Sequence, residues 1–467
     1  MRQIKKYIKH SFFVPAAIVF VSLITAPLTF AGAIYTWTNQ TSSGSHSWDT
    51  ISSSSTGQYL VSGYNGGYLY TSNNYGATWT AESSSGSNDW IYTAVSSSGQ
   101  YQVAVPYGGD IVTSNNYGAT WTADTGPGSH TWGAVASDST GQYLLAGIYG
   151  GDLYTSNNYG ATWTAETGPG SQYWNGASSS SSGQYLIATS LNGGSGGEVW
   201  ISNNYGATWT QPSGPGSQNW YGAASSASGQ YLVTASYSGD IWTSSNYGAN
   251  WTDQTSAGSQ DWTSEASTAS GQYMAATVEG GYIYTSSNYG ATWTAQTTPG
   301  TASWWGVALS SNGSQLAVST YGGDIWTGTI AYPGITNQTI DVTVNKSATV
   351  SVLNGVTGSP DSTTLAILSG PAQGNATVSS GSIIYTPNSG YTGTDSLAYQ
   401  VCSSVISTVC SQATLTFDIT AATVNPPDTG FAKPVTTNGL TTLIIYSTIT
   451  ISLVVIGFGL RKLSSKK

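Results

Sequence analysis

The eight residues Ser72-Asn73-Asn74-Tyr75-Gly76-Ala77-Thr78-Trp79 recur in six near-identical copies along this chain. The other copies begin at Ser114, Ser156, Ser202, Ser244 and Ser286, at steps of 42, 42, 46, 42 and 42 residues. A period in the forties is typical of a repeated supersecondary unit that buries its apolar face only against its neighbours. We therefore interpret most of the chain as a repeat protein.

Each repeat is predicted to contain four short strands. In the first repeat we expect them at residues 48–52, 58–61, 68–71 and 79–80. Tyr, Trp, Val, Ile and Thr, which favour strands, fill these segments, and Gly, Asn and Ser lie between them. Four short strands of this kind form one blade of a β-propeller.

The octapeptide resembles the Asp box, Ser-x-Asp-x-Gly-x-Thr-Trp, of sialidase-like propellers. That family also includes xyloglucan-degrading enzymes, sortilin-like receptors and photosystem assembly factors. All six copies carry Asn where the family has Asp, beginning with Asn74. An Asn side-chain oxygen can still accept the backbone N–H groups of the turn. The resemblance implies a structural role for the box, and so it is no active-site signature.

Seven blades are expected, because a tryptophan opens the first strand of each of seven units: Trp48, Trp90, Trp132, Trp174, Trp220, Trp262 and Trp304. The seventh unit has a third strand at residues 324–327 but no box after it. Its fourth strand is expected at the front of the chain, since Trp37 lies 42 residues before Trp79. We predict an all-β, seven-bladed propeller over residues 34–330, closed by residues 34–39, which leaves no open sheet edge.

Residues 333–421 are predicted to form a second, smaller β-sandwich. Residues 383–397 resemble the Tyr-Thr-Pro-x-x-x-Tyr-x-Gly-x-Asp-Ser-Phe pattern of cadherin-like or immunoglobulin-like modules in bacterial surface proteins, with Leu397 in place of Phe. The resemblance implies a stalk. A hairpin would bring Cys402 and Cys410 together; a disulfide there would contribute about 2–3 kcal/mol, and two free thiols are the alternative.

Both ends of the chain indicate export. Residues 1–33 read as a signal peptide, with basic residues before an apolar run at 12–28 and the small-x-small pattern Ala31-Gly32-Ala33. The alternative is an uncleaved membrane anchor.

The C-terminal end reads as a surface anchor. Residues 440–460 are an apolar run that predicts a transmembrane helix, followed by a basic cytoplasmic tail at 461–467. The linker, residues 422–439, contains Pro426-Pro427-Asp428-Thr429-Gly430, which resembles a cell-wall sorting signal with Pro in place of the first Leu. The resemblance implies sortase cleavage between Thr429 and Gly430 and a cell-wall partner; a permanent single-span anchor is the alternative. Either interpretation places the protein on the extracellular face of the envelope.

The composition excludes several functions. No Lys or Arg occurs between residues 34 and 345, against sixteen Asp and Glu, so binding to nucleic acid is not expected. Arg2 and Arg461 are the only arginines, which excludes a sialidase, because that chemistry needs an Arg cluster to hold the substrate carboxylate. No Ser-His-Asp arrangement, metal-ligand cluster or cofactor motif is evident.

A candidate ligand site is expected on the propeller face that carries the second-to-third-strand turns. An acidic residue follows the Gly pair of most blades, and the seventh blade carries a doubled tryptophan. These candidates are Asp110, Asp152, Glu198, Asp240, Asp324, Trp304 and Trp305. Aromatic faces with acid acceptors suit a sugar or an ammonium group. The alternative is that the acids serve turn geometry and the tryptophans pack the blades together.

These observations predict a surface-anchored binding protein of the adhesin type, whose propeller binds a glycan or a surface protein. A glycoside hydrolase acting on a neutral polysaccharide is the first alternative, because a ring of acids could supply the two carboxylates required. An extracytoplasmic assembly factor is the second.

Overall fold

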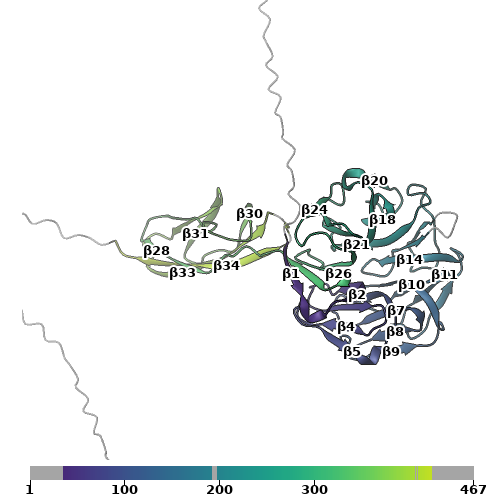
Figure 1. Ribbon diagram of the computed structural model, residues 1–467. Helices are drawn as coiled ribbons and strands as arrows, with labels where there is room; N and C mark the ends of the chain where they lie inside the picture. Colours follow the sequence, from purple (N-terminus) through teal and green to yellow (C-terminus); the bar gives the residue numbers. More distant parts are fainter. Residues whose placement is uncertain (1–34, 192–196, 405, 408, 423–467) are drawn as a thin grey trace, which may run out of the picture. The chain divides into compact units, whose positions relative to one another are not determined.

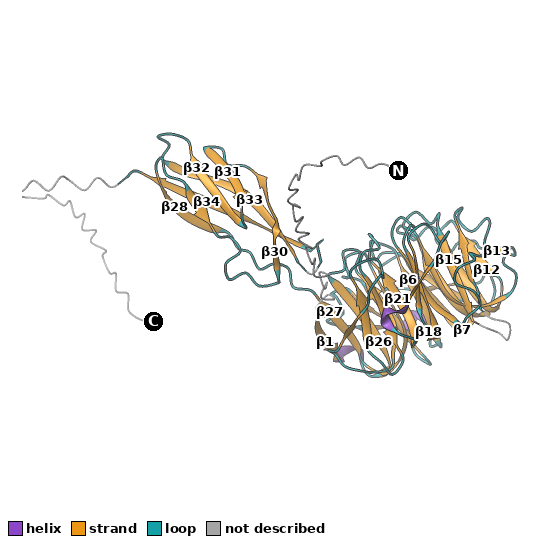
Figure 2. Cartoon of the chain, turned by 90° about the horizontal axis from the view of Figure 1, so that it is seen from above, coloured by secondary structure: helices purple, strands orange, loops and turns teal. Residues whose placement is uncertain are grey.

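The computed structural model describes residues 35–191, 197–404, 406–407 and 409–422 (Figure 1). The predicted signal peptide, sorting motif, apolar span and basic tail lie outside these residues, and so do residues 192–196 of the fourth repeat. Within the described residues the chain is β-structure, joined by loops and three short 3₁₀ turns, η1 (Thr41–Ser43), η2 (Ser83–Ser85) and η3 (Thr255–Ala257) (Figure 2). No helix among them is long and apolar enough to cross a membrane.

The propeller is built from antiparallel blades whose strands follow one another in the chain. The first strands are β2 (His46–Ser53), β6 (Trp90–Val95), β10 (His130–Ser137), β14 (Gln172–Ser179), β17 (Trp220–Ser225), β21 (Gln260–Ser267) and β25 (Trp304–Leu309). The second strands are β3 (Leu60–Tyr64), β7 (Gln102–Gly109), β11 (Leu144–Gly151), β15 (Leu186–Leu191), β18 (Leu232–Gly239), β22 (Met274–Val278) and β26 (Gln315–Gly323).

The third and fourth strands form the outer part of each blade. The third strands are β4 (Leu69–Ser72), β8 (Ile111–Ser114), β12 (Leu153–Ser156), β16 (Val199–Ser202), β19 (Ile241–Ser244), β23 (Ile283–Ser286) and β27 (Ile325–Thr329). The fourth strands are β5 (Thr80–Glu82), β9 (Thr122–Asp124), β13 (Thr164–Glu166), β20 (Thr252–Gln254), β24 (Thr294–Gln296) and, for the seventh blade, β1 (Thr36–Gln40). In the fourth blade this strand is reduced to a single bridge between Ile201 and Thr210.

The ring closes head to tail, as the spacing of Trp37 predicts. Strand β1 pairs antiparallel with β27, with Trp37 opposite Gly328 and Asn39 opposite Trp326. At the far end of the first strands, one backbone N–H of each blade donates to a carbonyl of the next, and the last blade donates back to the first: Ser55 to Ser97, Ser97 to Ser139, Ser139 to Ser181, Ser181 to Ala227, Ala227 to Ala269, Ala269 to Ser311 and Ser311 to Ser55, at 2.7–3.1 Å. This circuit of hydrogen bonds passes through seven blades. Figure 1 shows the blades arranged around a common centre.

The seven first-strand tryptophans form the core between blades. Each is at most 1% exposed, and each indole N–H donates to a backbone carbonyl, for instance Trp132 Nε1 to Gly109 O at 3.0 Å. A buried aromatic ring with its N–H satisfied contributes a large apolar area without an unpaired donor. The tryptophans therefore hold neighbouring blades together.

The octapeptide turns hold each third strand to its fourth strand. In the first copy Asn74 Oδ1 accepts the Thr78 N–H at 2.9 Å, and Ser72 Oγ accepts the Gly76 N–H at 2.9 Å. The bond to the Asn oxygen recurs in every copy. The prediction that Asn can take over the accepting role of Asp is confirmed.

The second region consists of two sheets. One contains β28 (Gln338–Thr343), β34 (Cys410–Thr420), β33 (Gly393–Ser403) and β30 (Pro360–Ser369), and the other contains β29 (Ala348–Val350), β32 (Ser382–Pro387) and β31 (Gly374–Ser379). Tyr385 and Phe417 stack in its core with ring centroids 3.9 Å apart.

Two side-chain features fasten this sandwich. Asp395, from the stretch that suggested an immunoglobulin-like module, is buried and accepts bonds from Ala372 N, Gln373 N and Tyr385 Oη at 2.8–2.9 Å. Cys402 and Cys410 lie directly opposite each other on β33 and β34 and are joined by a disulfide. Both features are structural.

Candidate functional site

A central channel runs along the axis of the propeller, and all seven first strands line it. It contains a cavity of about 130 Å³ whose wall includes Asp49, Tyr92, Glu265 and Trp305. In every blade the pairing of the first and second strands shifts directly after the tryptophan, for example between Trp262 and Ser264. A bulge at this place re-aims the following side chains.

Glu265 is the unusual residue of the channel. It is 6% exposed, and neither carboxylate oxygen has a hydrogen-bond partner among the described residues. Burial raises the pKa of Glu265 to about 8, so the isolated side chain is mostly protonated at neutral pH. A buried carboxyl without a partner costs free energy, and a ligand that supplies the partner would recover it.

The repeat itself does not require an acid at this place. The positions equivalent to Glu265 in the other six blades are Ile51, Thr93, Val135, Ala177, Ala223 and Val307. Six small or apolar residues satisfy the same backbone geometry. Blade packing therefore gives no reason for a carboxylate at position 265.

Asp49 is a second acid in the channel wall. It lies near the start of β2, at the end of the channel that carries the second-to-third-strand turns, which we call the mouth. Burial, and then the neighbouring charge of Asp89, raise the pKa of Asp49 to about 7. The pKa of Tyr92 is raised as well, mainly by burial and to a smaller extent by electrostatic repulsion from Tyr221, Glu265 and Asp49. Two acids that titrate near neutrality thus share one phenol as a neighbour.

Further acids and aromatic rings surround the mouth. The Tyr237 hydroxyl donates to Glu279 Oε2 at 2.8 Å, which, with burial, raises the pKa of Tyr237 to about 12. The Tyr237 ring stacks on Tyr221, with centroids 4.9 Å apart, and Ser238 Oγ donates to Asp261 Oδ1 at 2.6 Å. Acidic and aromatic side chains, Glu279, Asp261, Tyr221 and Tyr237, therefore gather at the mouth.

The five predicted acids lie away from the channel cavity, each directly before the third strand of its blade. Three of them accept a serine hydroxyl from the connection to the next blade. These bonds are Ser171 to Asp152 at 3.1 Å, Ser217 to Glu198 at 2.6 Å and Ser259 to Asp240 at 2.7 Å. Burial lowers the pKa of His46, and the nearby charge of Asp324 partly opposes this effect. Asp110 has no side-chain hydrogen bond within the described residues. For Asp152, Glu198 and Asp240 these bonds favour a structural role, although the bonds join blade connections and do not serve the turn geometry that the sequence left open as the alternative.

The two predicted tryptophans separate. Trp304 is 1% exposed and packs between blades, so the expectation that a ligand contacts its ring is corrected. Trp305 lines the channel cavity and packs against Tyr321, with centroids 5.8 Å apart. Of the predicted ligand residues, Trp305 is the one that the structure places in the channel with Glu265. Thr429 and Gly430 lie outside the described residues.

Sequence reasoning missed Glu265, Asp49 and the mouth tyrosines. Aligning the first strands on their tryptophans would have shown a carboxylate at a position that is otherwise Ile, Thr, Val or Ala. Within the described residues no group of three or more His, Cys, Asp or Glu side chains is arranged to hold a metal ion. The site is therefore one of carboxyls, phenols and an indole.

Comparisons with known proteins support the two-part architecture. A BNR-Asp box repeat model matches residues 241–254, and a bacterial Ig domain model matches residues 331–420. The chain thus combines Asp-box repeats in a propeller with a bacterial Ig domain. No curated protein matches the sequence significantly.

Solved structures share the propeller. The GH74 xyloglucanase from Xanthomonas campestris is 16% identical, with a TM-score of 0.50 over 63% of this chain; this chain covers 53%, about half, of the xyloglucanase. YCF48 from Cyanidioschyzon merolae is 14% identical, with a TM-score of 0.49 over 62% of this chain and 98% of its own. A structure of YCF48 bound to D1 peptide is 13% identical, with a TM-score of 0.48 over 64% of this chain and 97% of its own. At such identities the likeness concerns the fold alone.

Proposed function

We propose that this protein is a surface-displayed binding protein whose propeller captures an envelope or partner-cell glycan that carries a protonated amine. The observation that carries the proposal is Glu265, which is buried in the channel and whose two carboxylate oxygens have no hydrogen-bond partner among the residues that the structure describes. An ammonium group would supply the missing partner as a charge-assisted hydrogen bond.

The surroundings of Glu265 suit the same ligand. Asp49 lies in the channel wall, and no Lys or Arg between residues 34 and 345 competes for either acid. Trp305 lines the channel cavity, and the stacked rings of Tyr221 and Tyr237 lie at its mouth, so that aromatic faces are available to a sugar ring or an ammonium group. The ligand is thus recognised by charge at the carboxyls and by stacking at the mouth.

Display on the cell surface is part of the proposal. The signal peptide at residues 1–33 and the anchor motifs at residues 426–430 and 440–460 support it. The match to a bacterial Ig domain agrees with a stalk between the propeller and the anchor.

Calorimetry with an amine-bearing sugar and its neutral N-acetylated form tests the proposal. The glucosamine trisaccharide carries free amines, whereas its N-acetylated form is neutral. We expect the full-length chain to bind the amine form at least about tenfold more tightly, the size of one charge-assisted bond. Because Glu265 gives up a proton when it pairs, the measured heat at pH 7 should depend on the ionisation enthalpy of the buffer.

Matched variants locate the site. Glu265→Ala, the residue that the fourth and fifth blades carry at this position, should abolish the preference for the amine sugar. Asp110→Asn removes a charge on the same face but outside the channel and should leave binding unchanged. Equal affinity for the two sugars in the unaltered protein would rule out an ammonium site.

Glycoside hydrolysis remains a second candidate because Asp49 and Glu265 both have pKa values raised toward neutrality in one channel. The calorimetric samples distinguish it. Reducing ends that accumulate with time, and that disappear in Glu265→Ala, would favour a hydrolase over a binding protein.

A further inference from the structure

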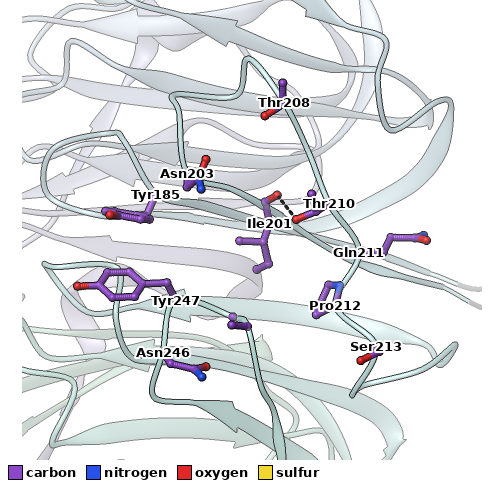
Figure 3. A pocket seen from close by; sticks show the side chains of 12 residues that line it. Tyr185, Ile201, Asn203, Thr208, Thr210, Gln211, Pro212, Ser213, Asn246 and Tyr247 are labelled. Atoms are coloured by element: carbon purple, nitrogen blue, oxygen red, sulfur yellow. Dashed lines mark hydrogen bonds between the residues drawn. The ribbon is translucent and has the colours of Figure 1, made fainter.

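A second site is suggested by a groove between the fourth and fifth blades, at the end of the blades that carries the octapeptide turns. The groove has a volume of about 610 Å³ and contains Tyr185, Ile201, Pro212, Asn246 and Tyr247 (Figure 3). It lies at the opposite end of the strands from the channel mouth, and so it is independent of the site proposed above.

Two substitutions in the fourth blade open this groove. In most other blades a third-strand threonine hydroxyl bonds to an acid or amide of the fourth strand. These pairs are Thr71–Glu82, Thr155–Glu166, Thr243–Gln254, Thr285–Gln296 and Thr327–Gln40, at 2.5–2.8 Å. Ile201 and Pro212 take these two positions in the fourth blade. Neither side chain can form the bond, and Pro212 has no N–H with which to extend the fourth strand.

The matching groove between the first and second blades shows the effect of this change. There Thr71 and Glu82 are present, and the volume is about 330 Å³. The groove beside Ile201 is therefore nearly twice as large and has lost its carboxylate. All of its lining side chains are uncharged.

A third substitution leaves an amide available in the same groove. In five octapeptides the central Asn donates its Nδ2–H to a threonine hydroxyl, as Asn204 does to Thr208 at 2.9 Å. In the copy of the fifth blade Asn250 replaces that threonine, and Asn246 Nδ2 has no partner within the described residues. Asn246 lines the groove and is drawn there as sticks (Figure 3).

An aromatic ring is also presented. The Tyr247 ring packs against Tyr185 at a tilt of 35°, with centroids 4.6 Å apart, and is still 41% exposed. Asn203 and Gln211 add exposed amides to the lining. Aromatic faces combined with uncharged amides and hydroxyls are the groups that hold the apolar faces and hydroxyls of a sugar.

We propose that this groove binds a neutral oligosaccharide, with Tyr247 as the stacking platform and Asn246 as a hydrogen-bond donor. Three departures from an otherwise uniform repeat, Ile201, Pro212 and Asn250, converge on this one junction. The absence of charge favours a neutral sugar over an acidic or amine-bearing one.

Saturation-transfer NMR of the full-length chain with cellotriose, maltotriose and xylotriose tests this site. The key variant is Ile201→Thr with Pro212→Glu, which restores the pair found in the first and third blades and so keeps a residue set that the fold already accepts. It should weaken binding at least tenfold while thermal unfolding stays cooperative.

A matched control adds the same charge elsewhere. Gln254→Glu introduces one carboxylate at the next junction, where Gln254 bonds to Thr243, and should leave binding unchanged. Glu265→Ala should also leave it unchanged, which separates this groove from the channel. The site is refuted if none of the three sugars binds, if the Ile201→Thr, Pro212→Glu variant still binds, or if the Gln254→Glu control loses binding as well.

Discussion

The two ends of the blades follow different rules. At the octapeptide end the same bonds recur from copy to copy, as when Ser72 Oγ and Ser114 Oγ accept the N–H of the glycine four residues later. In the channel, equivalent positions hold Ile, Thr, Val, Ala and, once, Glu265. Uniform positions therefore support the fold, and the informative residues are those that break the pattern. The following experiments test this distinction.

The largest effect is expected at a repeated core residue. Trp132→Ala should lower the free energy of unfolding by about 3–5 kcal/mol, because it empties a fully buried indole site between blades. Trp305→Ala, in the channel wall, should cost less than about 2 kcal/mol. Urea denaturation of both variants measures the difference, and equal losses would contradict the division into framework and ligand residues.

Glu265→Ala should change the pH dependence of stability. The folded-state pKa of Glu265 is about 8, well above the ordinary value of 4.5, so the folded protein holds a proton that the unfolded chain releases between these values. The free energy of unfolding therefore falls as pH rises through this window, and the variant lacks that contribution. At pH 9 the variant should be more stable than the unaltered protein by roughly 1–3 kcal/mol, the cost of an unpaired buried group.

Urea titrations at pH 5, 7 and 9 measure this effect. The gap between variant and unaltered protein should widen toward high pH. Val at the same position, as in the third blade, should behave like Ala, because only the carboxyl matters. A gap that is constant with pH would show that Glu265 does not titrate in this window.

Ser114→Ala should have a moderate effect confined to one turn. The substitution removes the acceptor of the buried Gly118 N–H, a bond of 3.0 Å, at a cost of about 1–2 kcal/mol. Ser98→Ala, which affects an exposed N–H of Gln100, provides the control and should cost less. Thermal unfolding of the two variants is the measurement, and similar melting temperatures would argue against a structural role for the box serine.

The smallest effect is expected for Asn74→Asp, which installs the residue of the related propellers. Oδ1 can still accept the Thr78 N–H, and only the donation from Nδ2 to the Thr78 hydroxyl is lost. Stability should change by less than about 0.5 kcal/mol. A large gain on denaturant titration would mean that the charge, as well as the oxygen, serves the turn.

Much of the fold was predictable because the same sequence pattern recurs in each blade. The repeat period predicted the blades. The distance from Trp37 to Trp79 predicted the closing strand β1, which pairs with β27. The oxygen of Asn74 accepts the turn N–H as expected. These features depend on local turns and spacing, which are visible in sequence.

The site was less predictable because the radial direction of a side chain depends on bulges that spacing does not reveal. Asp152 and Glu198 stand out as acids after turns, yet both are bonded to serines of the next connection. Glu265 lies inside a strand and is not distinguished from other polar residues by its local sequence. Only superposition of the blades shows that the equivalent positions are Ile, Thr, Val or Ala. Pro212 is visible in the sequence as a residue that interrupts strands. The groove, however, also depends on Ile201, and the structure was needed to show that the two residues lie together.

Strand β1 gives the predicted cleavage site a structural consequence. The strand begins at Thr36, only a few residues beyond the predicted cleavage after Ala33. A chain cut within β1 would lose the residues that pair with β27, and the seventh blade would then lack its fourth strand. If the chain is processed as the sequence predicts, the position of the cleavage therefore determines whether the ring can close.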